Sequence, residues 1–201
     1  RRAHRPRLGG GGLGRGRRQP SPTRIPDHPR RLEGQGRRAK PLTADYVLYY
    51  RNTKLAVIEA KAWNLPLTEG VAQAKNYAGK LDVRFTYSTN GQGLYGIDMH
   101  EGVEGECAWP TPDELWDRTF AKPNAWRDRF AAVPFEDKGG FFQSRYHQDT
   151  AVQRVLEVIA TGRNRILLTL ATGTGKTFIA FQIAWKLFHG RWNLGGEPTR
   201  R

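Results

Sequence analysis

From residue 45 onward, the chain contains two apolar stretches separated by a short polar one. Residues 45–50 (DYVLYY) are β-branched and aromatic, residues 51–54 (RNTK) are polar, and residues 55–61 read LAVIEAK. Such runs favour strands, and the polar spacer suits a hairpin turn, so we expect an antiparallel hairpin. Because side chains alternate along a strand, Glu59 and Lys61 share one face.

The pattern then alternates between helical and extended stretches. Residues 69–81 carry apolar side chains at every third or fourth position, which predicts a helix. Residues 83–88 predict a strand that ends at the Asn90-Gly91 turn signal, and residues 94–97 predict a further short strand. Residues 101–106 are acidic and contain glycine, so we expect a loop there.

A helix start and a glycine pair divide the middle of the chain. Thr111-Pro112 provides a side-chain cap followed by proline at the first helical position, with acids in the first turn. Gly139-Gly140 is our candidate domain boundary. We expect a first domain over residues 41–140 and the beginning of a second over residues 141–190.

The second domain begins with a helix and a strand. Residues 148–160 predict a helix with an apolar face, and residues 165–170 (RILLTL) predict a buried parallel strand. A glycine-rich loop and another helix, running through Leu187, follow. Together the two domains predict an α/β protein.

Basic residues are concentrated at the N-terminus. The net charge is +14, and residues 1–40 contain 13 of the 33 Lys and Arg residues but only two of the 19 acids. This tract is rich in Gly and Pro and poor in apolar residues, which predicts disorder, as we also expect for residues 191–201. A basic tail would raise nonspecific affinity for nucleic acid, although a merely solvated tail is the simpler interpretation.

The composition excludes several classes of protein. A single cysteine, Cys107, excludes an internal disulfide framework and is typical of a reducing compartment. No apolar run reaches the length of a membrane span, and the five histidines lack metal-ligand spacing. We expect a cytoplasmic protein.

The strongest chemical signal is the loop ATGTGKT between the predicted strand 165–170 and the following helix. Its glycines would let backbone N–H groups surround phosphates at a helix N-terminus. Lys176 would meet the β- and γ-phosphates of ATP, and the Thr177 hydroxyl would hold Mg²⁺. The strict pattern places glycine where this chain has Leu170. The predicted nucleotide-binding residues are Gln148, Thr172, Gly173, Thr174, Gly175, Lys176 and Thr177.

Gln148 lies upstream of this loop, in the sequence RYHQ. Its amide would read the adenine edge as both donor and acceptor. A glutamine at a helix start is more often a cap or a solvated residue. The downstream phosphate loop makes adenine recognition the better hypothesis.

The hairpin supplies a second candidate site. Asp45 begins one strand and Glu59 and Lys61 end the next, so the three converge if the strands pair. Two carboxylates and the Ala60 carbonyl would bind Mg²⁺, which activates water for attack on a phosphodiester, while Lys61 would orient that water or assist its deprotonation. From the residues alone this pattern is weak, and a surface ion pair between Glu59 and Lys61 is the default interpretation.

Gln73 and Tyr77 lie four residues apart on the predicted helix 69–81 and therefore share a face. They would support the carboxylate site or touch DNA. The candidate catalytic residues are Asp45, Glu59, Lys61, Gln73 and Tyr77.

Several of these segments, in this order, resemble one known family. The segments ADYVLYY, LAVIEAKAW, GVAQAKNYA, RFTYSTNG, RYHQDTAV and ILLTLATGTGKT resemble the N-terminal half of type I restriction enzyme R (restriction) subunits, over residues 44–189. The resemblance implies a restriction-endonuclease-like (PD-(D/E)xK) nuclease followed by the start of a RecA-like P-loop ATPase lobe. It implies ATP-dependent endonucleolytic cleavage of double-stranded DNA with Mg²⁺, coupled in the full-length family to translocation, within a complex with modification and specificity subunits.

The resemblance also assigns roles. Asp45, Glu59 and Lys61 match the family's catalytic triad, and Gln73 and Tyr77 match its accessory Gln-x-x-x-Tyr motif. Residues 145–148 match the adenine-recognising segment, and residues 172–177 match the first helicase motif.

The chain also departs from the family pattern. Only residues 178–201 follow Thr177, without the acidic motif or the second lobe, and an Arg/Gly/Pro tract replaces the N-terminal helices. We therefore expect a truncated product with at most weak nucleotide binding. The alternatives are an inactive fragment that only binds DNA or partner subunits, and an orphan nuclease–helicase fusion.

Overall fold

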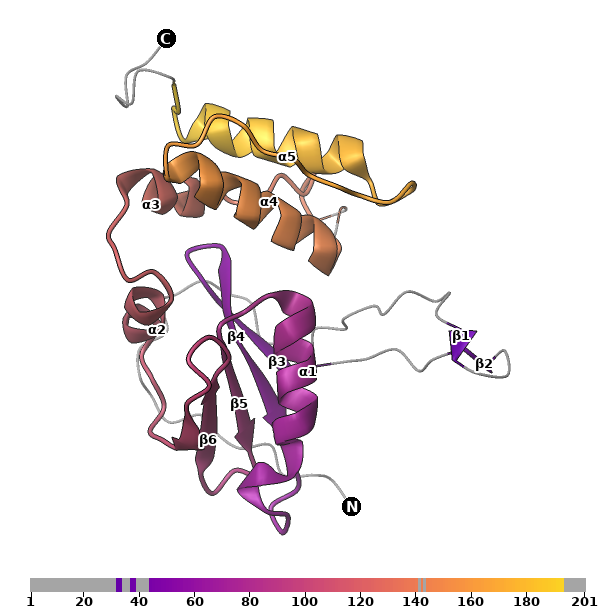
Figure 1. Cartoon of the computed structure of the whole chain (residues 1–201), viewed down its shortest axis with the longest axis vertical. Coiled ribbons are helices and arrows are strands. Elements are labelled where there is room, and N and C mark those ends of the chain that lie inside the picture. Colours follow the sequence, from indigo (N-terminus) through magenta and orange to yellow (C-terminus); the bar gives the residue numbers. More distant parts are fainter. Residues whose placement is uncertain (1–31, 34–36, 39–43, 141, 143, 194–201) are drawn as a thin grey trace. The chain divides into compact units, whose positions relative to one another are not determined.

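The structure is a computed structural model that describes residues 32–33, 37–38, 44–140, 142 and 144–193. Its chain divides into two compact units (Figure 1). Unit 1 contains the chain up to Leu48 and residues Lys54–Ala121, and unit 2 contains Tyr49–Thr53 and the chain from Lys122.

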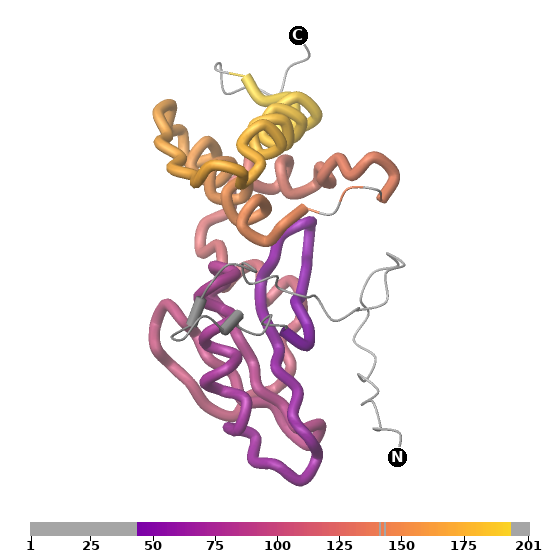
Figure 2. Tube along the Cα trace, turned by 90° about the vertical axis from the view of Figure 1, so that its right-hand side faces the viewer, coloured from indigo at the N-terminus to yellow at the C-terminus, as the bar shows by residue number. Residues whose placement is uncertain are grey.

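Unit 1 is built on a five-stranded sheet with the order β3-β4-β5-β6-β7. The hairpin of β3 and β4, drawn in indigo in Figure 2, turns through Arg51 and Asn52, which both have positive φ. Strand β5 runs parallel to β4, whereas β6 and β7 continue antiparallel. The predicted hairpin and the next two strands are therefore confirmed. The strands are β3 (Tyr46–Tyr50), β4 (Thr53–Ala60), β5 (Phe85–Thr89), β6 (Leu94–Asp98) and β7 (Glu104–Glu106).

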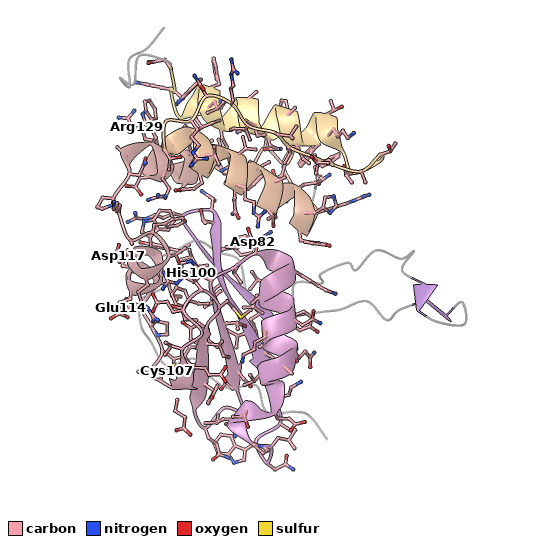
Figure 3. The ribbon with its side chains drawn as sticks, in the orientation of Figure 1. Asp82, His100, Cys107, Glu114, Asp117 and Arg129 are labelled. Carbon is pink, nitrogen blue, oxygen red and sulfur yellow. The ribbon has the colours of Figure 1, made fainter. Side chains whose placement is uncertain are left out.

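Helix α1 (Val71–Leu81), preceded by the short 3₁₀ helix η1 (Leu67–Gly70), connects the parallel strands β4 and β5. It packs along one face of the sheet (Figure 1), and the Thr86 hydroxyl donates to the Ala74 carbonyl of the helix at 3.2 Å. Parallel neighbours need such a crossover, which the sequence pattern predicted over residues 69–81. The helix ends at Asp82, whose left-handed conformation (φ 57°) closes the last turn (Figure 3).

Helix α2 (Pro112–Thr119) begins as the sequence predicted. The Thr111 hydroxyl accepts from the Glu114 N–H at 3.2 Å, and the Glu114 carboxylate accepts from the Thr111 N–H at 2.7 Å. This capping box (Glu114 is labelled in Figure 3) satisfies two donors that a helix start would otherwise leave unpaired. The loop expected over residues 101–106 is wrong in part, because β7 pairs there with β6.

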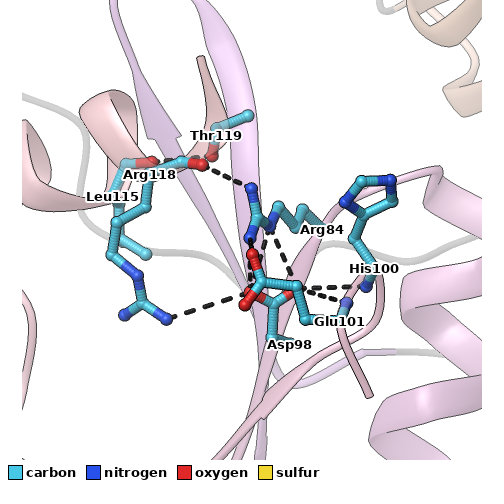
Figure 4. Close-up of polar contacts among 7 residues, drawn as sticks. All are labelled: Arg84, Asp98, His100, Glu101, Leu115, Arg118 and Thr119. Carbon is cyan, nitrogen blue, oxygen red and sulfur yellow. Dashed lines mark hydrogen bonds and ion pairs between the residues drawn. The ribbon is translucent and has the colours of Figure 1, made fainter. Parts of the chain in front are cut away.

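A cluster of charged side chains joins β5, β6 and α2 (Figure 4). Arg84 donates through Nη2 to Asp98 at 2.7 Å and to Glu101 at 2.5 Å, and through Nη1 to the Arg118 carbonyl at 2.7 Å. Burial alone would raise the pKa of Asp98, but the Arg84 hydrogen bonds and the His100 and Glu101 N–H groups lower it overall. The ionised form of Asp98 is therefore part of the fold of unit 1.

Unit 2 consists mainly of three helices, α3 (Ala125–Ala132), α4 (Tyr146–Ala160) and α5 (Lys176–His189). Phe130, Val152, Leu156 and Ile179 form the centre of its core. The sequence did not predict α3, because its apolar residues are few and its cap, Asn124, is not followed by a clear periodic stripe. Among the described residues, no helix is both long and apolar enough to cross a membrane.

Two polar side chains of α5 hold the segment that follows α3. The Gln182 amide accepts from the Glu136 N–H at 3.1 Å and donates to the Glu136 carbonyl at 2.7 Å. Buried Lys186 donates to the carbonyls of Phe130 at 3.2 Å and Val133 at 2.5 Å. Burial lowers the pKa of Lys186 to about 8.

The predicted buried strand over residues 165–170 is wrong. These residues belong to neither sheet, and Leu167 is 92% exposed. A strand needs a hydrogen-bonded neighbour, and none of the strands in the described ranges lies beside this segment.

Gly139-Gly140 lies inside unit 2, whose longer segment begins at Lys122, ahead of α3. Helix α3 belongs to this unit because it packs into the same hydrophobic core as α4. Leu32–Glu33 and Arg37–Arg38 pair as the strands β1 and β2, and the expected disorder of residues 1–40 stays a prediction. The rest of residues 1–40, and residues 194–201 of the expected tail, lie outside the described residues.

We predict that Asp98→Ala lowers the free energy of unfolding by about 2–4 kcal/mol, because it leaves the Arg84 guanidinium without its main partner. The matched change Glu101→Ala removes a partner whose side chain is 61% exposed and should cost less than about 1 kcal/mol. Urea unfolding of the two variants measures both values. Equal losses would contradict a central role for Asp98.

Candidate functional site

The first candidate site lies where β4 ends. Asp45 precedes β3, and its Oδ2 accepts from the Ala60 N–H at 2.8 Å. This bond joins the mouth of one strand to the end of the next, as the hairpin predicted. Asp45 and Glu59 are close enough for the charge on Asp45 to affect the pKa of Glu59.

Side chains from β4 and α1 form a continuous hydrogen-bonded chain at this rim. The Lys61 ammonium donates to Glu59 Oε1 at 2.9 Å and to Gln73 Oε1 at 2.8 Å. Gln73 in turn donates through Nε2 to the Tyr77 hydroxyl at 2.8 Å. The structure therefore brings together all five residues proposed for this site. Tyr77 is buried, so contact between Tyr77 and DNA is not compatible with this structure.

Glu59 is a buried carboxylate with incomplete partners. Its side chain is 4% exposed, and Oε2 has no hydrogen-bond partner among the described residues. Burial and the nearby Asp45 raise the pKa of Glu59, against the opposing effect of Lys61. The hydroxyl of Ser88, which is paired in register with Glu59 on β5, is also buried without a partner in the described part of the chain.

Gly70 closes the site from the side of α1. A Cβ added there would lie 2.6 Å from Ser88 Oγ, 3.0 Å from Glu59 Cγ and 3.2 Å from Lys61 Cε. Only a residue without a side chain leaves room for these three groups. Sequence reasoning missed both Gly70 and Ser88. The one available signal was the strand register, which places Ser88 beside Glu59 only once the pairing is known.

The donor set suits a hard divalent cation but is small. Two carboxylates, one with a buried oxygen that has no partner in the described part of the chain, and a backbone carbonyl are oxygen ligands of the kind that Mg²⁺ prefers. In the described ranges, no group of three or more His, Cys, Asp or Glu side chains is arranged to hold a metal. A cation here would therefore depend on Asp45, Glu59, the Ala60 carbonyl, and water or substrate oxygens.

The second candidate site is the loop before α5. Gly173 and Gly175 have φ values of 80° and 83°, which glycine adopts without strain. Gly175 is the N-cap of α5 and provides no side-chain hydrogen bond, so no capping side chain occupies the N–H groups of the first turn. Lys176 and Thr177 are exposed beside it. This arrangement suits an anion at the helix N-terminus.

Gln148 binds this loop from α4. Its Nε2 donates to the Thr174 carbonyl at 2.9 Å, and its Oε1 accepts from the Arg145 N–H at 2.9 Å. His147 Nε2 lies 3.3 Å from the same carbonyl. Both ends of the Gln148 amide are thus bonded within the chain. Its predicted adenine contact would require these bonds to be exchanged.

Comparison with known proteins identifies relatives of both units. The family described as "Type III restriction enzyme, res subunit" matches residues 141–193. The endonuclease subunits of the type I restriction enzymes EcoAI and EcoKI of Escherichia coli are 38% and 26% identical, and each alignment covers 74% of this chain. A solved HsdR-subunit fragment of a type I restriction enzyme from Vibrio vulnificus superposes with a TM-score of 0.75 at 36% identity, over 89% of this chain.

The segment that matches the restriction-enzyme res-subunit family includes the glycine loop and α5 of unit 2. The chain is similar, over most of its length, to the endonuclease subunits of type I restriction enzymes and to the HsdR fragment. It spans about a fifth of the length of the curated relatives, 20% and 17%, and 35% of the solved fragment.

We predict that Gly70→Ala lowers the free energy of unfolding by about 1–3 kcal/mol, because its methyl group would overlap the Ser88 hydroxyl. The matched change Gly79→Ala lies in α1 with nothing within 4 Å of the added carbon. It should stabilise the helix by about 0.5–1 kcal/mol. Urea unfolding separates the two, and a neutral Gly70→Ala would show that the site tolerates a closer helix.

Proposed function

We propose that unit 1 is a nuclease domain of the restriction-endonuclease-like (PD-(D/E)xK) fold that cleaves double-stranded DNA with Mg²⁺. The observation that supports this most strongly is that Asp45, Glu59 and Lys61 meet at the end of β4, where Glu59 Oε2 is buried without a partner among the described residues. A surface ion pair would not need burial. The 4% exposure of the Glu59 side chain therefore favours chemistry over surface pairing.

Each proposed catalytic residue has a defined task. Asp45, Glu59 and the Ala60 carbonyl would hold Mg²⁺, which supplies a water of lowered pKa and neutralises charge on the phosphodiester. Lys61 would orient the attacking water or assist its deprotonation. The hydrogen bonds from Lys61 to Glu59 and Gln73 fix its ammonium group, and Tyr77 fixes Gln73. Gln73 and Tyr77 are thus positioning residues.

We further propose that the loop of residues 172–177 binds ATP with Mg²⁺. Lys176 would contact the β- and γ-phosphates and Thr177 the metal, at a helix N-terminus that no side chain caps. In a complete restriction subunit this site would drive DNA translocation. The modification and specificity subunits of a restriction complex would be the partners. Because the substrate is DNA, we expect the complex to act in the cytoplasm.

One observation favours a second candidate function. Segment 165–170 belongs to neither sheet and Leu167 is largely exposed, so no sheet among the described residues supports the phosphate loop. In this alternative the chain binds DNA or partner subunits without turning over ATP. The nuclease proposal for unit 1 does not depend on that outcome.

We predict that Asp45→Asn abolishes Mg²⁺-dependent plasmid nicking, with a loss of at least about 10²-fold, because metal-held charge is worth several kcal/mol in the transition state. The asparagine oxygen still accepts from the Ala60 N–H, so the hairpin is preserved. Lys61→Ala should cost about 10²–10⁴-fold.

The controls for this prediction are Asp117→Ala and Lys122→Ala, which remove exposed charges outside the site. Both should nick plasmid at the rate of the unchanged chain. If Asp45→Asn also nicks at that rate, the nuclease proposal is wrong.

A further inference from the structure

Trp63 is an exposed aromatic residue beside the proposed nuclease site. It lies two residues after Lys61, and 66% of it is exposed. An extended chain spans at most about 3.6 Å per residue, so the two Cα atoms are within about 7 Å. Successive nucleotides of one DNA strand rise by about 3.4 Å, so a phosphate at Lys61 places Trp63 within about two nucleotides of it.

The backbone around Trp63 is firmly held. The Lys61 N–H donates to the Thr89 carbonyl at 2.7 Å, which continues the pairing of β4 and β5 beyond the end of β4. Gln92 Nε2 donates to the Trp63 carbonyl at 2.7 Å, and Asn90 Nδ2 donates to the Leu65 carbonyl at 2.8 Å. The loop that carries the indole is therefore fixed by two side chains of the neighbouring β5–β6 turn.

The indole itself rests on a glycine. A Cβ added at Gly91 would lie 3.3 Å from Trp63 Cε3 and 3.5 Å from Cζ3, and Gly91 has a φ of 86°. One part of the ring thus packs on bare backbone, while most of its surface faces outward. A scattered surface aromatic needs no such support. A ring held rigidly with its surface open has the features of a binding group, because little conformational freedom is lost on contact.

We propose that Trp63 packs against the sugar and base of a nucleotide that flanks the scissile phosphodiester. This inference rests on the proposed nuclease function and adds a substrate contact to it. DNA is the occupant that the placement favours, because the indole is joined rigidly to the residue that would face the phosphate. Apolar side chains that enter DNA grooves, and aromatic rings that contact bases, supply affinity without reading phosphate charge.

The test measures the binding of duplex DNA by the full chain carrying Asp45→Asn, a change that prevents cleavage. The readout is the fluorescence anisotropy of an end-labelled DNA. Adding Trp63→Ala should weaken binding about tenfold, whereas Trp63→Phe should recover most of the loss. The slope of log affinity against log salt should stay unchanged, because no phosphate contact is removed. Trp109→Ala, which removes another exposed tryptophan of unit 1, should leave affinity unchanged.

The outcomes separate this inference from the proposed function. Unchanged affinity in Trp63→Ala, an equal loss in Trp109→Ala, or a reduced salt slope would overturn the DNA contact. Thermal unfolding of Trp63→Ala should match the unchanged chain, and a large drop would assign the indole to stability instead. If the tryptophan-dependent binding is found but the unchanged chain does not nick plasmid, the DNA contact stands and the nuclease proposal fails.

Discussion

The burial of Glu59 beside Lys61 is the constraint on which the rest of unit 1 depends. A carboxylate taken out of water costs free energy unless it is paired, and here Lys61 pairs only one of its oxygens. The hairpin, through the bond from Ala60 to Asp45, and α1, through Gln73, hold both partners at the end of β4. Native proteins retain such an incompletely satisfied group where it serves a function. The raised pKa of Glu59 expresses the same cost, which a bound cation would offset.

Much of this rim was predictable from local rules. The two-residue strand period placed Glu59 and Lys61 on one face, the short polar spacer brought Asp45 to them, and helix spacing aligned Gln73 with Tyr77. The site environment was not predictable, because Ser88 and Gly70 enter it only through the register of β4 with β5 and the entry of η1. These contacts depend on the tertiary structure, so the periodicity of the sequence cannot predict them.

The errors in unit 2 have a common physical cause. Residues 165–170 have the composition of a buried strand, but a strand exists only with a hydrogen-bonded neighbour, and the described residues offer none. By contrast, the predicted helix α4 and the glycine loop before α5 are confirmed, because both depend mainly on residues that are close in the sequence. The polar contacts of Gln182 and Lys186 with the segment after α3 were also invisible in sequence, since they join side chains to distant backbone groups.

The central claim is that Asp45 and Glu59 form a cation site, and the ionisation of Glu59 tests it most directly. The measurement is a carboxyl ¹³C NMR titration of the full chain with and without Mg²⁺, with the Glu59 signal assigned from the Glu59→Gln variant. We predict a pKa above the ordinary glutamate range without the ion and a clear decrease when Mg²⁺ is added, because the cation favours the ionised form. Asp45→Asn should remove most of that decrease. A Glu59 pKa that is the same with and without Mg²⁺ would contradict the account.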